Sequence, residues 1–273
     1  MAGLKSDLQK SDIKRKAKSL GATLVGFTNV QRYREYYPEA PAIFHPDRIW
    51  PEARSVIVMA VPLNLPIVES TPSINYQELY NTSNIMLDNL AYRLSLYLMD
   101  KGQAAIWAPR DGYGSLDYLI DRASSSFSQV IAGYLAGLGT IGWSHNLLTP
   151  QYGSRHRLVS VLTSAKIAPD KVLSQSLCLH CDLCRRLCPV GALKGDRRAD
   201  FADMDMNKCT RRHQELKAAG CWPCGLCTKV CPVGADRRLF NRTDAKLYLK
   251  ESKGQSSPEI EAWNQMRAYG SHR

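Results

Sequence analysis

Eight of the nine cysteines fall into two runs with the same internal spacing. The runs are Cys178-x2-Cys181-x2-Cys184-x3-Cys188-Pro189 and Cys221-x2-Cys224-x2-Cys227-x3-Cys231-Pro232. Thiolates three residues apart on a tight loop reach different corners of one four-iron, four-sulfur cube, whereas the cysteine before proline starts a new segment and points away. The spacing therefore predicts two [4Fe–4S] clusters, which move electrons one at a time.

In two-cluster bacterial ferredoxins, which have this spacing, the fourth cysteine of each run ligates the other cluster. We therefore expect one cubane on the first three cysteines of the first run and the last of the second: Cys178, Cys181, Cys184 and Cys231. The second cubane should use Cys188, Cys224, Cys227 and one further thiolate, for which the spacing indicates Cys221. Zinc on paired CxxC motifs is the alternative, but the third CxxC step and the Cys-Pro endings argue against it.

Composition limits the kind of protein. The chain has 273 residues, of which 44% are hydrophobic, enough for one large and one small domain. No stretch approaches the roughly 18 apolar residues of a membrane span, and the first residues lack the apolar region of a secretion signal. We therefore expect a cytoplasmic protein without a membrane segment, whose cysteines bind metal and do not form disulfides.

The net charge of +11 is concentrated toward the C-terminus, where residues 176–273 hold 18 Lys+Arg against 11 Asp+Glu. A basic surface favours an anionic partner, such as tRNA, an acidic electron donor or a phosphate-bearing cofactor. Alternatively, the basic side chains offset the charge of the clusters, about −2 for each oxidised cubane.

The other distinctive segment, 136–154, contains Gly137, Gly139, Gly142 and Gly153. Glycines let the backbone approach a large flat ligand, and the free N–H groups of such a loop can bind phosphate or amide groups. The alternative is a helix end followed by an irregular loop. The segment is not a dinucleotide fingerprint, because its glycines do not follow a strand and open a helix.

Titratable residues lie in and near this segment. His145 and His156 could contact a ligand or could be ordinary hydrogen-bonding residues. Candidate proton donors are Tyr80, Tyr113, Tyr118 and Asp121, although most tyrosines simply pack.

Hydrophobic periodicity predicts alternating helices and strands in the first 170 residues. The expected helices are 4–20, 77–101, 115–135 and 243–250, and the expected strands are 23–27, 55–61, 104–108 and 158–162. The two cysteine runs form an internal repeat with an offset of 43 residues, from Cys178 to Cys221. We expect an α+β protein with an α/β domain at 1–172, a ferredoxin-like domain at 173–240, and a helix with a polar tail at 241–273.

The glycine-rich segment, placed before a double-cubane module, resembles the epoxyqueuosine reductase family, which is related to reductive dehalogenases. The shared motifs are Gly137-Leu138-Gly139, Gly142-Trp143, Asn146-Leu147-Leu148 and Gly153-Ser154. The resemblance runs over roughly residues 8–240. It implies a nitroreductase-like α/β domain that holds cobalamin against a ferredoxin-like domain, with the clusters reducing the corrinoid.

The resemblance also implies roles for single residues. The corrinoid would contact nine residues of this segment and its flank: Gly139, Gly142, Trp143, His145, Asn146, Leu147, Gly153, Ser154 and His156. Because that family takes one cluster ligand from well upstream of the final motif, Cys209 rivals Cys221 as the eighth ligand. Family members also have a proton-donating aspartate, whose aligned position here is Ala123, with Asp121 two residues away.

We therefore expect a cobalamin-dependent reductase with two [4Fe–4S] clusters, which receives electrons from flavodoxin or ferredoxin and reduces a small or unknown substrate. One alternative is an electron-transfer protein that reduces the corrinoid or metal centre of a partner. A second is a minimal tRNA epoxyqueuosine reductase, which we expect less because no helical-repeat extension for tRNA follows in this sequence.

Overall fold

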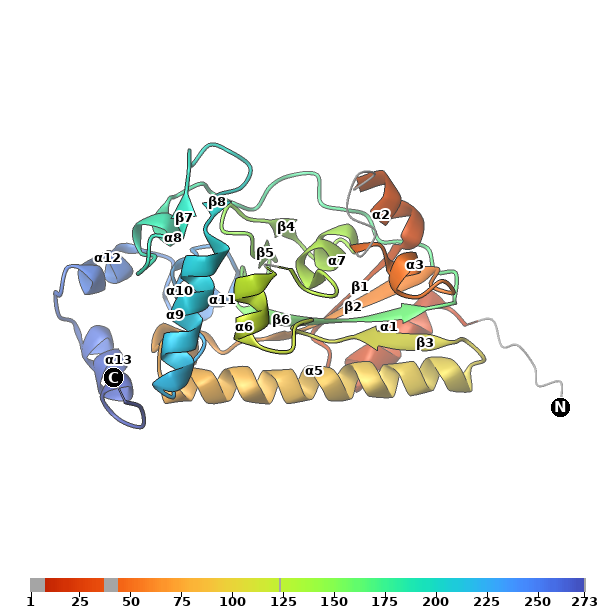
Figure 1. Ribbon diagram of the computed structural model, residues 1–273, viewed down its shortest axis with the longest axis horizontal. Helices are drawn as coiled ribbons and strands as arrows, with labels where there is room; N and C mark the ends of the chain where they lie inside the picture. The colour runs from red at the N-terminus through yellow and green to blue at the C-terminus, as the bar shows by residue number, and fades with distance from the viewer. Residues whose placement is uncertain (1–7, 37–43, 123, 273) are drawn as a thin grey trace.

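A four-stranded antiparallel sheet forms the centre of the N-terminal half in the computed structural model, which describes residues 8–36, 44–122 and 124–272 (Figure 1). The strand order is β1 (Leu24–Asn29), β2 (Ser55–Pro62), β6 (His156–Thr163) and β3 (Ala105–Ala108). The inner strands β2 and β6 are buried almost throughout, which explains their nearly continuous apolar sequence. The expected α+β class is confirmed. Helices alternate with strands along the sequence, a pattern that often gives a parallel sheet, but here the strand pairs are antiparallel.

Helices cover both faces of this sheet. The long helix α5 (Ile74–Asp100) and helix α1 (Lys10–Ser19) pack on one face, and α7 (Gln129–Leu135) packs on the other. The side chain of Ser73 begins α5 by accepting a hydrogen bond from the Tyr76 N–H. Helix α5 runs beneath the whole sheet and continues under the C-terminal half (Figure 1), so its first turns lie beside the second cysteine run.

The expected helix at 115–135 is wrong, because the segment forms α6 (Leu116–Asp121) and α7 with a break between them. Serine side chains compete with helical hydrogen bonds, and in this break the Ser125 hydroxyl donates to the Phe127 carbonyl. The Ser126 N–H also turns away, to the Gly112 carbonyl. Three short helices were not expected: α2 (Val30–Tyr36), α3 (Pro46–Ile49) and α4 (Leu65–Glu69).

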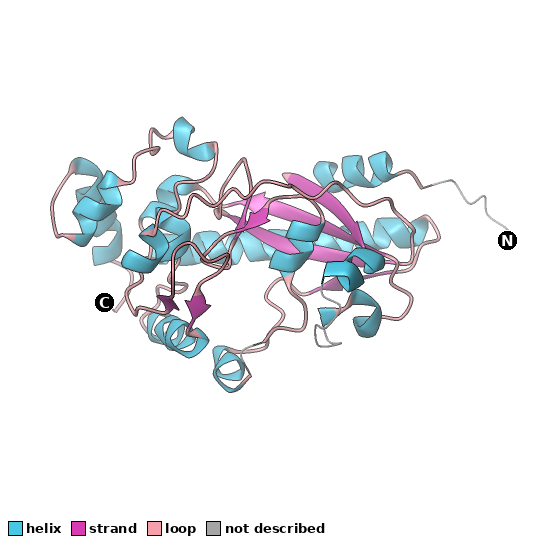
Figure 2. Ribbon diagram, turned by 90° about the horizontal axis from the view of Figure 1, so that it is seen from above, coloured by secondary structure: helices cyan, strands magenta, loops and turns pink. Residues whose placement is uncertain are grey.

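The C-terminal half consists of short elements around the cysteine runs, away from the large sheet (Figure 2). They are the ribbon β7 (Leu193–Lys194) with β8 (Asp203–Met204), and the helices α8 (Leu183–Arg186), α9 (Met206–Ala218), α10 (Leu226–Val230) and α11 (Asp236–Leu239). The ribbon β4 (Thr140–Ile141) with β5 (Leu147–Leu148) packs against α7 beside the large sheet. Asp182 and Gly225, 43 residues apart, both adopt a left-handed conformation before a helical turn, at φ 66° and 63°. The repeat seen in the sequence is therefore a repeat of local structure.

The last residues are helical where a polar tail was expected. Helix α12 (Lys246–Ser252) corresponds to the expected helix at 243–250, and α13 (Pro258–Ala268) follows it. The Ser257 side chain caps α13, and Pro258 occupies its first turn, a favourable pair of residues for a helix start. In the described part of the chain no helix is long and apolar enough to cross a membrane.

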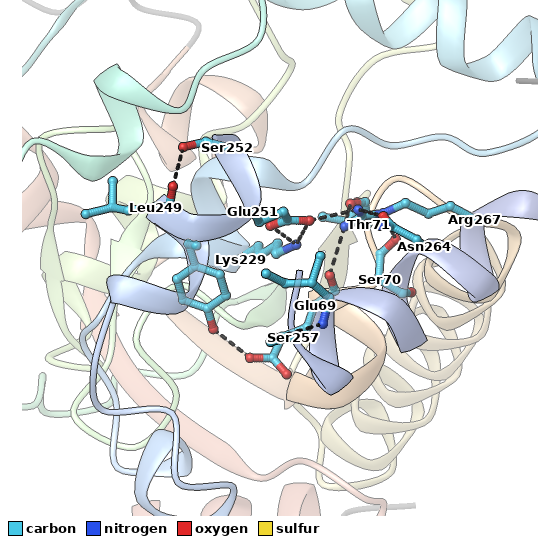
Figure 3. A network of polar contacts seen from close by, with 12 residues as sticks. Glu69, Ser70, Thr71, Lys229, Leu249, Glu251, Ser252, Ser257, Asn264 and Arg267 are labelled. Carbon is cyan, nitrogen blue, oxygen red and sulfur yellow. Dashed lines mark hydrogen bonds and ion pairs between the residues drawn. The ribbon is translucent and has the colours of Figure 1, made fainter. Parts of the chain in front are cut away.

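A buried ionic network joins these last helices to both halves of the molecule (Figure 3). Glu251 of α12 accepts hydrogen bonds from Lys229 of α10, at 2.7 and 2.8 Å, and forms an ion pair with Arg267 of α13 at 2.7 Å. Arg267 also donates to the carbonyls of Glu69, Ser70 and Thr71. Because Thr71 in turn donates to the Cys224 carbonyl, the network fixes the second cysteine run against the start of α5.

Candidate functional site

Four cysteines line a first cavity of about 30 Å³: Cys178, Cys181, Cys184 and Cys231. Three of them come from the first run and one from the second, as the ferredoxin spacing predicts. Trp143 and Leu148 of the glycine-rich segment form another wall. Cys181 is exposed, so this cavity lies at the protein surface.

Four other cysteines line a second cavity of about 60 Å³: Cys188, Cys209, Cys224 and Cys227. Asp205 begins helix α9 by accepting a hydrogen bond from the Lys208 N–H, and α9 carries Cys209 to the cavity wall one residue later. Cys221 lines neither cavity and is fully buried in the apolar interior. Of the two candidates for the eighth thiolate, the structure thus places Cys209 beside the other three.

The surroundings of the thiols disfavour a free thiolate. Burial, together with the charges of neighbouring cysteines, raises the pKa of Cys184 and of Cys209 to about 12 and that of Cys224 to about 11. A coordinated metal deprotonates such thiols. Among the described residues no three His, Cys, Asp or Glu side chains converge on the position of one ion.

The glycine-rich segment packs onto the C-terminal half through three side chains. The Trp143 indole donates to the Asp196 carbonyl at 3.1 Å, and His145 Nε2 donates to the Ala202 carbonyl at 2.8 Å. Asn146 Nδ2 donates to the Cys227 sulfur at 3.5 Å. The segment therefore holds both cysteine-lined cavities in place.

Leu147 and Ser154 have similar structural contacts. Leu147 lies in the apolar core between the sheet and α7, and the Ser154 hydroxyl donates to the Thr228 carbonyl at 3.4 Å.

The glycines of the segment face the protein itself. A Cβ at Gly142 would lie 2.7 Å from the Leu148 side chain, and Cβ atoms at Gly139 and Gly153 would collide with the Leu148 and Val233 carbonyls. Close approaches of the chain to itself are therefore sufficient to require these glycines. Their contact with a corrinoid stays a prediction.

His156 is buried at the start of β6, and its Nδ1 has no hydrogen-bond partner among the described residues. Burial lowers the pKa of its imidazole to about 4. The ring is therefore neutral at physiological pH, and its contact with a ligand also stays a prediction.

Two of the four candidate proton donors, Tyr80 and Tyr113, lie together. Tyr80 is buried and donates to Asp111 Oδ1 at 2.9 Å, while the guanidinium of Arg157 lies 4.2 Å from the centre of its ring and pairs with the same carboxylate. Tyr113 is hydrogen-bonded to Tyr80, and burial raises the pKa of both phenols. These residues form a polar cluster near the start of α5.

Asp121 and Tyr118 lie outside this cluster. Both are exposed on α6, at its last residue and its middle. Ala123, the position aligned with the proton-donating aspartate, lies outside the described residues.

An aromatic side chain connects the tyrosine cluster with the second cavity. The Trp222 ring packs edge-on against Tyr80 at 4.6 Å and against His213 at 6.4 Å between ring centres. His213 lines the second cavity, and burial lowers its pKa to about 4. Trp222 Nε1 is buried without a partner among the described residues. Sequence reasoning missed Trp222, although its place between Cys221 and Cys224 was a usable signal.

Comparisons with known proteins agree with this arrangement. A model of the 4Fe-4S dicluster domain matches residues 177–236. A tetrachloroethene reductive dehalogenase from Desulfitobacterium hafniense is 25% identical over 147 residues, which are 53% of this chain and 24% of the relative.

Two solved structures are similar to almost the whole chain. A reductive dehalogenase superposes with a TM-score of 0.68 at 20% identity, over 96% of this chain and 39% of that one. The epoxyqueuosine reductase from Streptococcus thermophilus superposes with a TM-score of 0.53 at 18% identity, over 94% and 78%.

The chain thus has a reductive dehalogenase and epoxyqueuosine reductase-like fold with a C-terminal 4Fe-4S dicluster domain, and it is homologous to reductase enzymes. It spans only about a quarter of the D. hafniense relative and well under half of the solved dehalogenase.

Proposed function

We propose that this protein is a reductase that passes electrons one at a time through two [4Fe–4S] clusters. The observation that carries the proposal is the pair of cavities, each lined by four cysteines, the number of ligands that one cubane takes. The first cluster would be held by Cys178, Cys181, Cys184 and Cys231, and the second by Cys188, Cys209, Cys224 and Cys227. Cys221 would then be a buried free thiol.

The positions of the cavities suggest the direction of electron flow. Cys181 of the first cavity is exposed, so an external donor such as flavodoxin or ferredoxin can approach that cluster. The four cysteines of the second cavity are all partly buried, and the rings of His213, Trp222 and Tyr80 pack edge-on beyond it. The first cluster is therefore the entry point, and the acceptor lies on the Trp222 side of the second.

Tyr113 is the best candidate for a proton donor at this acceptor site. Reduction of most organic substrates consumes protons as well as electrons, and the donor must carry its proton at the working pH. A tyrosine phenol carries its proton at neutral pH at its ordinary pKa of 10, and burial, which raises the pKa of Tyr113, leaves it protonated. Tyr80, Asp111 and Arg157 hold the neighbouring hydrogen bonds in place and position Tyr113.

A corrinoid is the acceptor that the relationship suggests, because the similar solved dehalogenase is described as an enzyme of B12-dependent dehalogenation. The residues of the glycine-rich segment do not form a visible cradle for it, since their close approaches are made by the protein's own chain. We therefore assign the corrinoid no step.

Anaerobic reconstitution tests the cluster proposal directly. Two cubanes require about eight irons and eight sulfides per chain, and a stoichiometry near four would refute the proposal. Cys209→Ser should lose the second cluster, whereas Cys221→Ser should keep both. The reverse pattern would make Cys221 the ligand.

Titration of the reconstituted protein with cob(II)alamin, followed by EPR, tests the acceptor. Saturable binding with a changed cobalt signal supports a corrinoid-dependent reductase. Both cluster signals without any binding favour an electron-transfer protein that reduces a partner. Salt-sensitive retention of tRNA would instead favour the epoxyqueuosine reductase alternative.

A further inference from the structure

Arg212 lies on the wall of the second cysteine-lined cavity with one hydrogen-bond donor unused. It follows Cys209 by three residues on α9, and residues three apart on a helix share a face. Its Nη1 donates to Glu215 Oε2 at 2.9 Å. Its Nε is buried and has no partner among the described residues.

Arg212 is partly exposed, but its buried Nε–H, which faces no partner among the described residues, indicates what the cavity must hold. Leaving such a group unsatisfied costs about 1–3 kcal/mol, and more for a charged group, so the occupant should accept a hydrogen bond. A [4Fe–4S] cluster with four thiolates offers sulfur acceptors and a charge of about −2. Arg212 lines the same cavity as Cys209 and Cys224, so its guanidinium lies beside the thiols that would hold such a cluster.

We infer that Arg212 donates its Nε–H to the second cluster and makes that cluster the more easily reduced of the two. The inference rests on the proposed two-cluster function. Reduction adds one electron to the cluster, from about −2 to about −3, without breaking a bond. A nearby cation and an N–H···S hydrogen bond both stabilise the more negative state.

Other hydrogen bonds to the same four thiols act in the same direction. The Ala192 N–H donates to the Cys188 sulfur at 3.3 Å, and the Asn146 amide donates to Cys227. Hydrogen bonds to cluster sulfurs are one of the factors that set reduction potential.

The arginines near the first cavity are placed differently. Arg185 is about half exposed and binds Asp182 through two hydrogen bonds, at 2.6 and 2.7 Å. Arg197 lines the first cavity but is exposed. Water and salt screen exposed charges strongly, so these residues stabilise a reduced cluster less than Arg212 does. The resulting difference in potential drives electrons from the surface cluster to the buried one.

The test is an EPR-monitored redox titration of the reconstituted full-length protein. Arg212→Gln should lower the potential of one cluster by about 59 mV or more, a tenfold change in its reduction equilibrium, and leave the other unchanged. Cys181→Ala, which removes a ligand of the first cluster, assigns the two signals. Arg211→Gln is the matched control, because it removes the same charge from an exposed neighbour on α9.

Equal potentials in the Arg212→Gln and Arg211→Gln proteins, with iron content intact, would overturn the inference. If Arg212→Gln loses the second cluster, Arg212→Lys decides the question. Lysine keeps the charge but lacks the Nε donor. The potential of the second cluster should therefore fall by less in the Arg212→Lys protein than the fall expected for Arg212→Gln. A potential equal to that of the wild type would count against the hydrogen bond. Wild-type iron content near four would instead refute the two-cluster function itself.

Discussion

Glu251→Gln should destabilise the protein strongly, because it removes the only carboxylate that pairs with Lys229 among the described residues. The Lys229 side chain is fully buried, and Glu251 is 18% exposed. Breaking a buried ion pair by removing one partner costs about 3–5 kcal/mol, since the remaining charge stays buried.

Two features place the cost at the low end of this range. The Lys229 ammonium lies 4.1 Å from the centre of the Trp263 ring, a cation–π contact that survives the substitution. Burial also lowers the pKa of Lys229 to about 8, a fall that Glu251 opposes, so without Glu251 the amine can lose its proton near neutral pH. We expect a cost of about 3 kcal/mol, which corresponds to a fall in melting temperature of roughly 6–12 °C for a chain of this size.

The assay is anaerobic thermal unfolding of the cluster-loaded protein at one scan rate, since unfolding with cluster loss is irreversible. Glu261→Gln, an exposed residue of α13, is the control and should cost less than about 0.5 kcal/mol. Adding Lys229→Met to Glu251→Gln should restore part of the stability by removing the unpaired charge. Equal melting temperatures for the Glu251→Gln and Glu261→Gln proteins would refute this reasoning.

Two further predictions concern the glycine-rich segment and its flank. Gly153→Ala should destabilise the protein and reduce retention of the first cluster, because the new Cβ collides with the Val233 carbonyl next to Pro232. The control is Gly191→Ala, at a similar φ of 57° but with open space around it, which should cost only the roughly 1–2 kcal/mol of left-handed backbone. Equal effects of the two substitutions on cluster content and melting temperature would contradict the packing argument. The second prediction concerns His156, whose pKa in the folded protein is about 4, below its ordinary 6.5. Between pH 4 and pH 6.5 the unfolded chain therefore binds more protons than the folded protein does. Stability should fall as the pH falls through 6.5 toward 4, by about 2 kcal/mol at pH 5. His156→Gln should lack this part of the pH dependence in melting curves between pH 7 and pH 5, and an unchanged dependence would show that another group titrates there.

The sequence predicted two kinds of element: strands that are buried on both faces, and helices whose apolar residues recur with the helical period. Strands β2 and β6 are buried on both faces, so their apolar runs could be recognised without knowing their partners. Helix α5 was recognised by the period of Leu90 and Leu94, which pack on the sheet. The break at 124–126 was not predicted, because apolar residues resume at Phe127 and the hydrogen bond to Gly112 is a tertiary contact. Helix α13 was likewise expected to be a tail, although Ser257 and Pro258 are a start signal.

The chemistry of the cysteine runs was determined by sequence alone, because three thiols spaced along a short loop reach the corners of one cube by local geometry. Tertiary structure decided which thiol completes the second set. Cys209 and Cys221 are both compatible with the sequence, and only the packing of α9 puts Cys209 on the cavity wall and Cys221 in the apolar interior. Tertiary structure likewise brought Tyr113 and Tyr80 to Arg157 and left Asp121 on the surface, since strand β6 and the loop after β3 meet only in the folded protein. Ligand spacing is a local property of the chain, whereas the fourth ligand and the surroundings of the site depend on contacts between distant segments.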